Sequence, residues 1–245
     1  MGTMLQAHDL TLEDFEGHEG CNEILNVTRP DVVRAVHDAY FEVGVDLVET
    51  NTFGANWANL AEYDITERIE ELAQAGARIA RESADHWSTP QQPRFVIGSV
   101  GPGTKLPTLG HAPYALLRDA YQRQVEGMLA GGVDAVLVET VQDVLQAKAA
   151  LVGARRAMDA VGSSAVLIAQ ITVETTGTML VGTETSAALV ALEPLGIDLA
   201  VESAGEKGIH DDVVGQELGA DEGAQALLQL LGALALAAAE PGQRL

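Results

Sequence analysis

The amino-acid sequence predicts an α/β fold built around a parallel sheet. Short runs rich in β-branched residues alternate with amphipathic helical stretches from Pro30 onward. The strand candidates are apolar throughout and end in polar or glycine-rich loops, which favours parallel strands covered on both faces by helices. A chain of 245 residues, 47% of them hydrophobic, has enough apolar surface for one large core. Right-handed βα units of this spacing close into a (β/α)8 barrel or open into a doubly wound sheet.

The first βα unit has the clearest boundaries. A helix is expected to begin at Pro30, whose fixed φ suits a first helical turn, and to end at Gly44. Thr28 or Asp31 would cap or charge its N-terminus. The elements expected after it are strand 45–50, helix 66–84, strand 94–100, helix 113–130, strand 134–139, helix 143–160, strand 165–173, helix 186–195 and strand 197–201. These residues therefore predict five strands.

The βα pattern ends near residue 201. Residues 202–223 are acidic and glycine-rich, and residues 224–239 consist almost entirely of alanine and leucine. The tail carries no strand signal, only one expected helix with an apolar stripe. We therefore divide the chain into a βα domain, residues 1–201, and a divergent tail, residues 202–245.

Charge and cysteine content exclude several classes of protein. The net charge of -22 argues against nucleic acid as a partner, because binding to phosphate relies on clustered lysine and arginine. The single cysteine, Cys21, cannot form an internal disulfide, and no segment resembles a secretory signal. The longest apolar run, 224–239, is too short to span a bilayer comfortably. These features predict a cytoplasmic protein without a membrane or nucleic-acid partner.

Six long blocks of the sequence are distinctive. They read MGTMLQ at 1–6, EGCNEILNVTRPDVV at 19–33, VDLVETNTFGAN at 45–56, GSVGPGTKLPTLGH at 98–111, LVETVQD at 137–143 and TVETTGTMLVG at 172–182. In content and order they resemble the homocysteine-binding domain that opens cobalamin-dependent methionine synthases, within the homocysteine S-methyltransferase family. Blocks this long are far more specific than a short motif, and the resemblance covers roughly residues 1–200.

The resemblance implies a fold and a chemistry. The fold would be a (β/α)8 TIM-type barrel that binds homocysteine at the carboxyl ends of its strands. The family holds a zinc ion through three cysteines, and zinc keeps the substrate sulfur as a thiolate, whereas a free thiol titrates near about pH 8.5. The methyl donor would be methylcobalamin, carried with the other donor modules outside this domain. The expected partners are therefore homocysteine and those modules.

The sequence departs from the family at both ends. The family's zinc cysteines lie in an Asn-Cys segment after the sixth strand and a Gly-Gly-Cys-Cys segment after the eighth, whereas this chain reads AVESAGEKG at 200–208. An Asp-Gly segment expected before Met1 is also missing. We therefore expect an incomplete barrel with its first strand clipped and its last two strands absent, inactive by itself. The alternatives are a non-catalytic remnant or binding module, and one part of a split enzyme.

Three residues are candidates for substrate binding. Glu139 ends a strand, where barrel enzymes place their chemistry, and the resemblance implies that it holds the homocysteine amino group; the alternative is a carboxylate that caps a loop. Asn51 and Thr52 would line the pocket or hydrogen-bond the turn after their strand. No catalytic residue and no metal ligand is predicted.

Other polar residues are weaker candidates. Gly101, Gly103 and Lys105 form a tight turn or, less readily, an anion-binding nest. Cys21 lies outside the family's ligand segments. The histidines show no spacing typical of metal ligands; they are His8, His18, His37, His86, His111 and His210.

Overall fold

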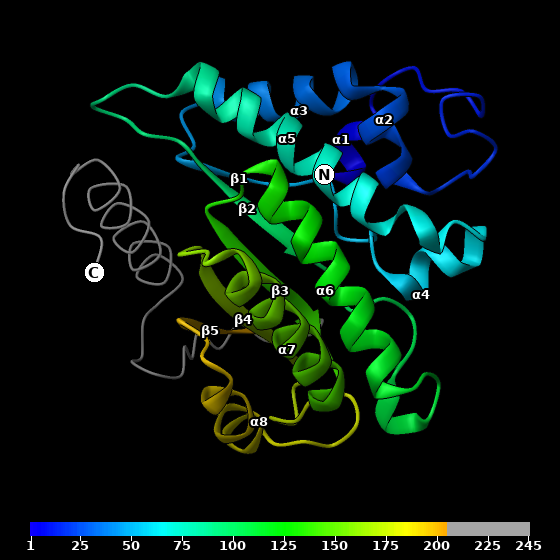
Figure 1. The fold of residues 1–245 in the computed structure, drawn as a ribbon, viewed down its shortest axis with the longest axis vertical. Coiled ribbons are helices and arrows are strands. Elements are labelled where there is room, and N and C mark those ends of the chain that lie inside the picture. Colours follow the sequence, from blue (N-terminus) through cyan, green and yellow to red (C-terminus); the bar gives the residue numbers. More distant parts are fainter. Residues whose placement is uncertain (205–245) are drawn as a thin grey trace.

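The computed structural model describes residues 1–204, which form one parallel sheet with helices packed against it (Figure 1). The strands are β1 (Leu47–Glu49), β2 (Phe95–Val100), β3 (Ala135–Val141), β4 (Val166–Val173) and β5 (Leu199–Ala204). The longer helices are α3 (Pro30–Glu42), α5 (Ile69–Trp87), α6 (Tyr114–Gly131), α7 (Val144–Val161) and α8 (Thr185–Leu192). The predicted α/β class is confirmed. The expected tail helix at 224–239 lies outside the described residues.

The order of the strands decides between the two predicted architectures. The sheet runs β1-β2-β3-β4-β5, and every neighbouring pair is parallel. Each right-handed crossover therefore advances in the same direction, which puts every connecting helix on one face of the sheet. A doubly wound sheet would instead reverse its order and place helices on both faces. The arrangement is that of a barrel wall, and the sheet is not closed within residues 1–204.

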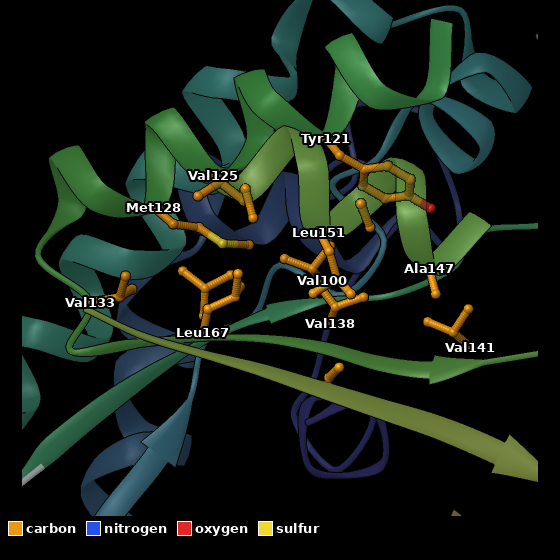
Figure 2. Close-up of a cluster of buried hydrophobic side chains, with 14 of the residues drawn as sticks. Val100, Tyr121, Val125, Met128, Val133, Val138, Val141, Ala147, Leu151 and Leu167 are labelled. Carbon is orange, nitrogen blue, oxygen red and sulfur yellow. The ribbon is translucent and has the colours of Figure 1, made fainter. Parts of the chain in front are cut away.

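The helix-covered face contains the main core. Figure 2 shows Val100 and Val138 of the sheet facing Val125 and Leu151 of α6 and α7. Adjacent helices pack closely where they lack side chains: a Cβ on Gly153 of α7 would lie 2.5 Å from the Arg118 carbonyl oxygen of α6. This close approach lets α6 and α7 lie side by side over the strands.

The opposite face of the sheet carries a smaller apolar cluster supplied entirely by strands. Its buried members are Phe95, Ile97, Ala135, Leu137, Val166 and Ile168, with Leu47, Leu199 and Val201 packed beside them. Because side chains alternate between the faces of a strand, these residues mark the inner face of the barrel wall. The expectation that helices cover both faces is therefore wrong, since strand side chains themselves fill the inner face.

Most element boundaries agree with the sequence, and the differences have local causes. The helix predicted from Pro30 ends before Gly44, which has a φ of +98°, as expected. Thr28 does not cap it, since its hydroxyl donates to the carbonyl oxygens of Asp14 and Ile24. Asp31 lies in its first turn, as expected, and places a negative charge at the helix N-terminus. Helix α5 runs to Trp87, beyond the predicted 84, because the Trp87 indole donates to Asp38 of α3 at 3.0 Å.

Three short helices were not predicted: α1 (Gly2–Leu5), α2 (Leu25–Thr28) and α4 (Trp57–Leu60). Each is only four residues long, so local sequence preference contributes little to it. Tertiary contacts stabilise α2 and its surroundings, since Asn26 Nδ2 donates to the carbonyl oxygens of Asn51 and Leu72. No helix within residues 1–204 is long and apolar enough to cross a membrane.

Candidate functional site

A cavity of about 570 Å³ opens at the carboxyl ends of β1, β2 and β3. It extends along β1 toward α3 and the N-terminal helix. The lining residues are Met1, Gly2, Asn22, Glu23, His37, Tyr40, Leu47, Val48, Glu49, Thr50, Asn51, Phe53, Ser99 and Glu139. Two of the three predicted site residues, Glu139 and Asn51, are brought together here, whereas Thr52 is not among the lining residues.

Glu139 is held in place by an irregularity in β3. The pairing of β3 with β4 shifts register between Val138 and Val141, and Thr140 takes a φ of +60°, which is rare for a β-branched residue. The Thr140 N–H donates to Gln170 Oε1 at 3.2 Å, and its hydroxyl donates to Glu139 Oε2 at 3.3 Å. The bulge thus turns the end of the strand and fixes the Glu139 carboxylate from one side.

Ser99 of β2 holds the same carboxylate from the other side. Its hydroxyl donates to Glu139 Oε1 at 2.5 Å. A short hydrogen bond to a carboxylate is typical of a strong, charge-assisted interaction. Both oxygens of Glu139 are therefore positioned by protein hydroxyl groups, which fixes where a ligand meets this side chain.

Thr52 supports the site from beneath. Its side chain is fully buried, and its hydroxyl donates to the Ser99 carbonyl oxygen at 2.8 Å. The Thr50 hydroxyl, which lies 2.6 Å from it, accepts from the Ser99 N–H at 3.0 Å. Since the Thr52 proton is already donated to Ser99, Thr50 donates to Thr52. This closed set of hydrogen bonds ties the loop after β1 to the strand that carries Ser99.

Asn51 combines a structural contact with a place in the cavity lining. Its Nδ2 donates to the Asn22 carbonyl oxygen at 2.8 Å and to Asn26 Oδ1 at 2.9 Å. Both amide protons are therefore used inside the protein. What Asn51 can offer a ligand is its Oδ1 acceptor.

Two glutamates that the sequence did not single out join Glu139 around the cavity. Glu23 accepts from the Gly54 N–H at 2.7 Å, and burial raises its pKa. Burial also raises the pKa of Glu49, and the neighbouring negative charge of Glu139 raises it further. No lysine or arginine lines the cavity in the described part of the chain. An acidic cavity of this kind favours a ligand with a cationic group.

The Gly101–Lys105 loop lies apart from the cavity lining. The Gly101 N–H donates to the Phe53 carbonyl oxygen at 3.1 Å, and the Asn56 amide packs against the same loop. Lys105 lies 4.0 Å from Glu62. The Gly101 N–H is therefore not available to bind an anion.

Cys21 is unsuited to metal binding. Its thiol is buried, and its Sγ lies 3.8 Å from Glu23 Oε2. Burial, together with the nearby Glu23 charge, raises the pKa of the thiol to about 12, whereas a zinc ligand must be a thiolate. Among residues 1–204, no group of three or more histidine, cysteine, aspartate or glutamate side chains is arranged to hold a metal ion.

Comparison with known proteins shows the family of this chain. The homocysteine S-methyltransferase family model matches residues 1–202. The chain belongs to the homocysteine S-methyltransferase family. It is 61% identical over 199 residues to a methionine synthase of Mycobacterium tuberculosis and 60% identical to one of Mycobacterium leprae, in each case over 81% of this chain. It spans 17% and 16% of the lengths of these two relatives.

A solved structure supports the family's fold. The metallated form of the homocysteine methyltransferase MmuM from Escherichia coli matches with a TM-score of 0.62 and 20% identity, over 82% of this chain and 71% of that one. Its oxidised form matches with the same TM-score and 19% identity. At this identity the likeness shows the fold only: the sheet of residues 1–204 is part of a TIM-type barrel.

Proposed function

We propose that this chain is a homocysteine-binding module of the methionine synthase type, and that its cavity binds the amino-acid end of the substrate. The observation that carries this proposal is the fixed Glu139 carboxylate at the end of β3, inside an acidic cavity. The substrate's ammonium group would pair with Glu139, and the Asn51 Oδ1 would accept a further hydrogen bond. Thr52 would act indirectly, by holding Ser99.

We propose the same division of the chain as the sequence suggests. Residues 1–201 would form the module and residues 202–245 the divergent tail, with β5 continuing past this boundary to Ala204. Support comes from the family match, which ends at residue 202. The methyl donor, methylcobalamin in the methionine synthase type, would arrive on other modules, in keeping with relatives several times longer than this chain.

The residues of this chain do not fit the zinc ion that the family uses. A site of three thiolates cannot be built from a single cysteine, and burial raises the pKa of the Cys21 thiol. We therefore propose a binding module that is inactive in methyl transfer by itself. A split enzyme is the second candidate, in which another polypeptide would supply the cysteines; the open sheet favours it, because β1 and β5 each pair on one side only within residues 1–204.

Substitution of Glu139 tests the binding proposal. The change Glu139→Gln removes the negative charge but keeps the shape of the side chain. A hydrogen bond to a charged group contributes roughly 1.5–3 kcal/mol, so homocysteine should bind roughly 10- to 100-fold more weakly. Isothermal titration calorimetry with the full chain measures this. Glu70→Gln is the matched control, because Glu70 is exposed on α5 and lies outside the cavity. Equal affinity in both variants would contradict the proposal.

Metal content tests the inactivity proposal. The purified chain is expected to hold well below one zinc ion per molecule after dialysis against micromolar zinc, and to transfer no methyl group to homocysteine. Atomic absorption and a methionine assay measure the two quantities. Stoichiometric zinc in the isolated chain would overturn this proposal. Zinc binding and activity that appear only on mixing with a cysteine-bearing partner polypeptide would favour the split enzyme.

A further inference from the structure

The alternation of side chains along β1 places Glu49 on the inner face of the barrel wall. Leu47, two residues earlier, belongs to the inner apolar cluster, whereas Val48 belongs to the core beneath the helices. The same alternation holds on the next two strands. Ser99 lies two residues after Ile97 on β2, and Glu139 lies two residues after Leu137 on β3; Ile97 and Leu137 both belong to the inner cluster. The three polar side chains therefore stand on one face at the carboxyl end of three adjacent strands.

We propose that Glu49 is a second carboxylate that binds the substrate's ammonium group, together with Glu139. The inference rests on the proposed function, which it deepens by assigning the group that selects an amino acid over other thiols. Glu49 lines the cavity: protein surrounds its carboxylate closely enough to raise the pKa, while the residue as a whole stays accessible. A cation held between two carboxylates gains charge-assisted hydrogen bonds from both.

The two carboxylates differ in how far the protein already satisfies them. Glu139 accepts hydrogen bonds on both oxygens, from Ser99 and Thr140. For Glu49, no side-chain hydrogen bond or salt bridge is formed with any residue in the 1–204 range. Glu139 is thus the fixed partner, and within residues 1–204 Glu49 lines the cavity with its carboxylate oxygens not used in hydrogen bonds to protein groups.

Several charges face Glu49 from the surrounding elements. The carboxylate of Glu139 on β3 opposes its ionisation, and the amino group of Met1 favours it. Glu23 and His37 line the same cavity from the segment before α2 and from α3. Burial holds His37 neutral at physiological pH, so it contributes no compensating positive charge. An incoming ammonium group therefore relieves repulsion between Glu49 and Glu139, and a ligand without that group does not.

This difference predicts selectivity for the amino group. Homocysteine and 4-sulfanylbutanoic acid share the thiol, the carbon chain and the carboxylate, and differ in the ammonium group. We expect the unmodified chain to bind homocysteine more tightly. In Glu49→Gln the preference should fall about tenfold, the effect of losing one charged partner. The milder Glu49→Asp should lose less, because it keeps the charge on a shorter side chain.

Titration calorimetry of the full chain with both ligands tests the inference, with near-UV circular dichroism as the check on folding. Glu70→Gln should keep the preference of the unmodified chain. If Glu49→Gln and Glu49→Asp both keep the preference for homocysteine, Glu49 is not a partner of the ammonium group and the inference is overturned. If the unmodified chain binds neither ligand, or binds both with equal affinity, the proposed function itself is wrong. The two failures are therefore separable.

Discussion

Replacing Asp143 with alanine is expected to destabilise the protein by roughly 2–4 kcal/mol. Asp143 is fully buried at the N-terminus of α7. Its Oδ1 accepts from the Leu145 N–H at 2.8 Å and from the Thr108 hydroxyl at 2.7 Å, and its Oδ2 accepts from the Thr108 N–H at 2.9 Å. Loss of a helix cap costs about 1 kcal/mol, and each of the two lost hydrogen bonds from Thr108 adds roughly 0.5–1.5 kcal/mol, because Thr108 is exposed and its donors can bond water instead.

Urea unfolding followed by circular dichroism measures this effect. Asp143→Asn should lose less, because it keeps one acceptor oxygen for the α7 cap. Asp159→Ala is the matched control, because Asp159 is exposed near the other end of the same helix and should change the free energy of unfolding by less than about 0.5 kcal/mol. A loss below about 1 kcal/mol for Asp143→Ala would show that Thr108 and the helix end find other partners, contrary to the expectation.

The sequence predicted the regular elements well because their signals are local. Pro30 and Gly44 delimit a helix through backbone restrictions that act within a few residues, and apolar runs mark the strands. The βα repeat alone could not decide the strand order, because a barrel wall and a doubly wound sheet share it; the family resemblance is what implied the barrel. Helix α2 was missed for a related reason: it depends on Asn26, whose partners lie far along the chain.

The candidate site was predicted only in part. Glu139 is recognisable at the end of a strand, but the positive φ of Thr140 that orients it has no signal in a β-branched residue. Glu49 was missed although a signal existed, since its alternation with Leu47 puts both on one face of β1. Thr52 was predicted as readily as Asn51 because both follow the strand; only the hydrogen bond from Thr52 to Ser99 shows that the two side chains point to different surroundings.

The second large effect concerns His37, which should make the protein less stable in acid. Its side chain is 1% exposed, and within the described residues its Nε2 has no hydrogen-bond partner. Burial lowers the pKa of His37 to about 4, although the Asp38 charge acts in the opposite direction. In the unfolded chain a histidine has a pKa of about 6.5. Between these two values the unfolded state binds more protons than the folded state, so stability falls as the pH falls through this window.

The expected size follows from the difference between the two pKa values. At about 1.4 kcal/mol for each pH unit, the loss between pH 7 and pH 4 attributable to His37 approaches about 3 kcal/mol. Glu23 and Glu49, whose pKa values are raised, contribute to the pH dependence of stability with the opposite sign, because their stabilising effect is lost as the pH rises.

The measurement is therefore a comparison of two proteins: urea unfolding at pH 7 and pH 4 for the unmodified chain and for His37→Gln. Because the glutamates are common to both proteins, their contribution largely cancels, and the unmodified chain should lose more stability in acid by that amount. Parallel pH profiles for the two proteins would mean that His37 becomes protonated without unfolding, through the cavity that it lines.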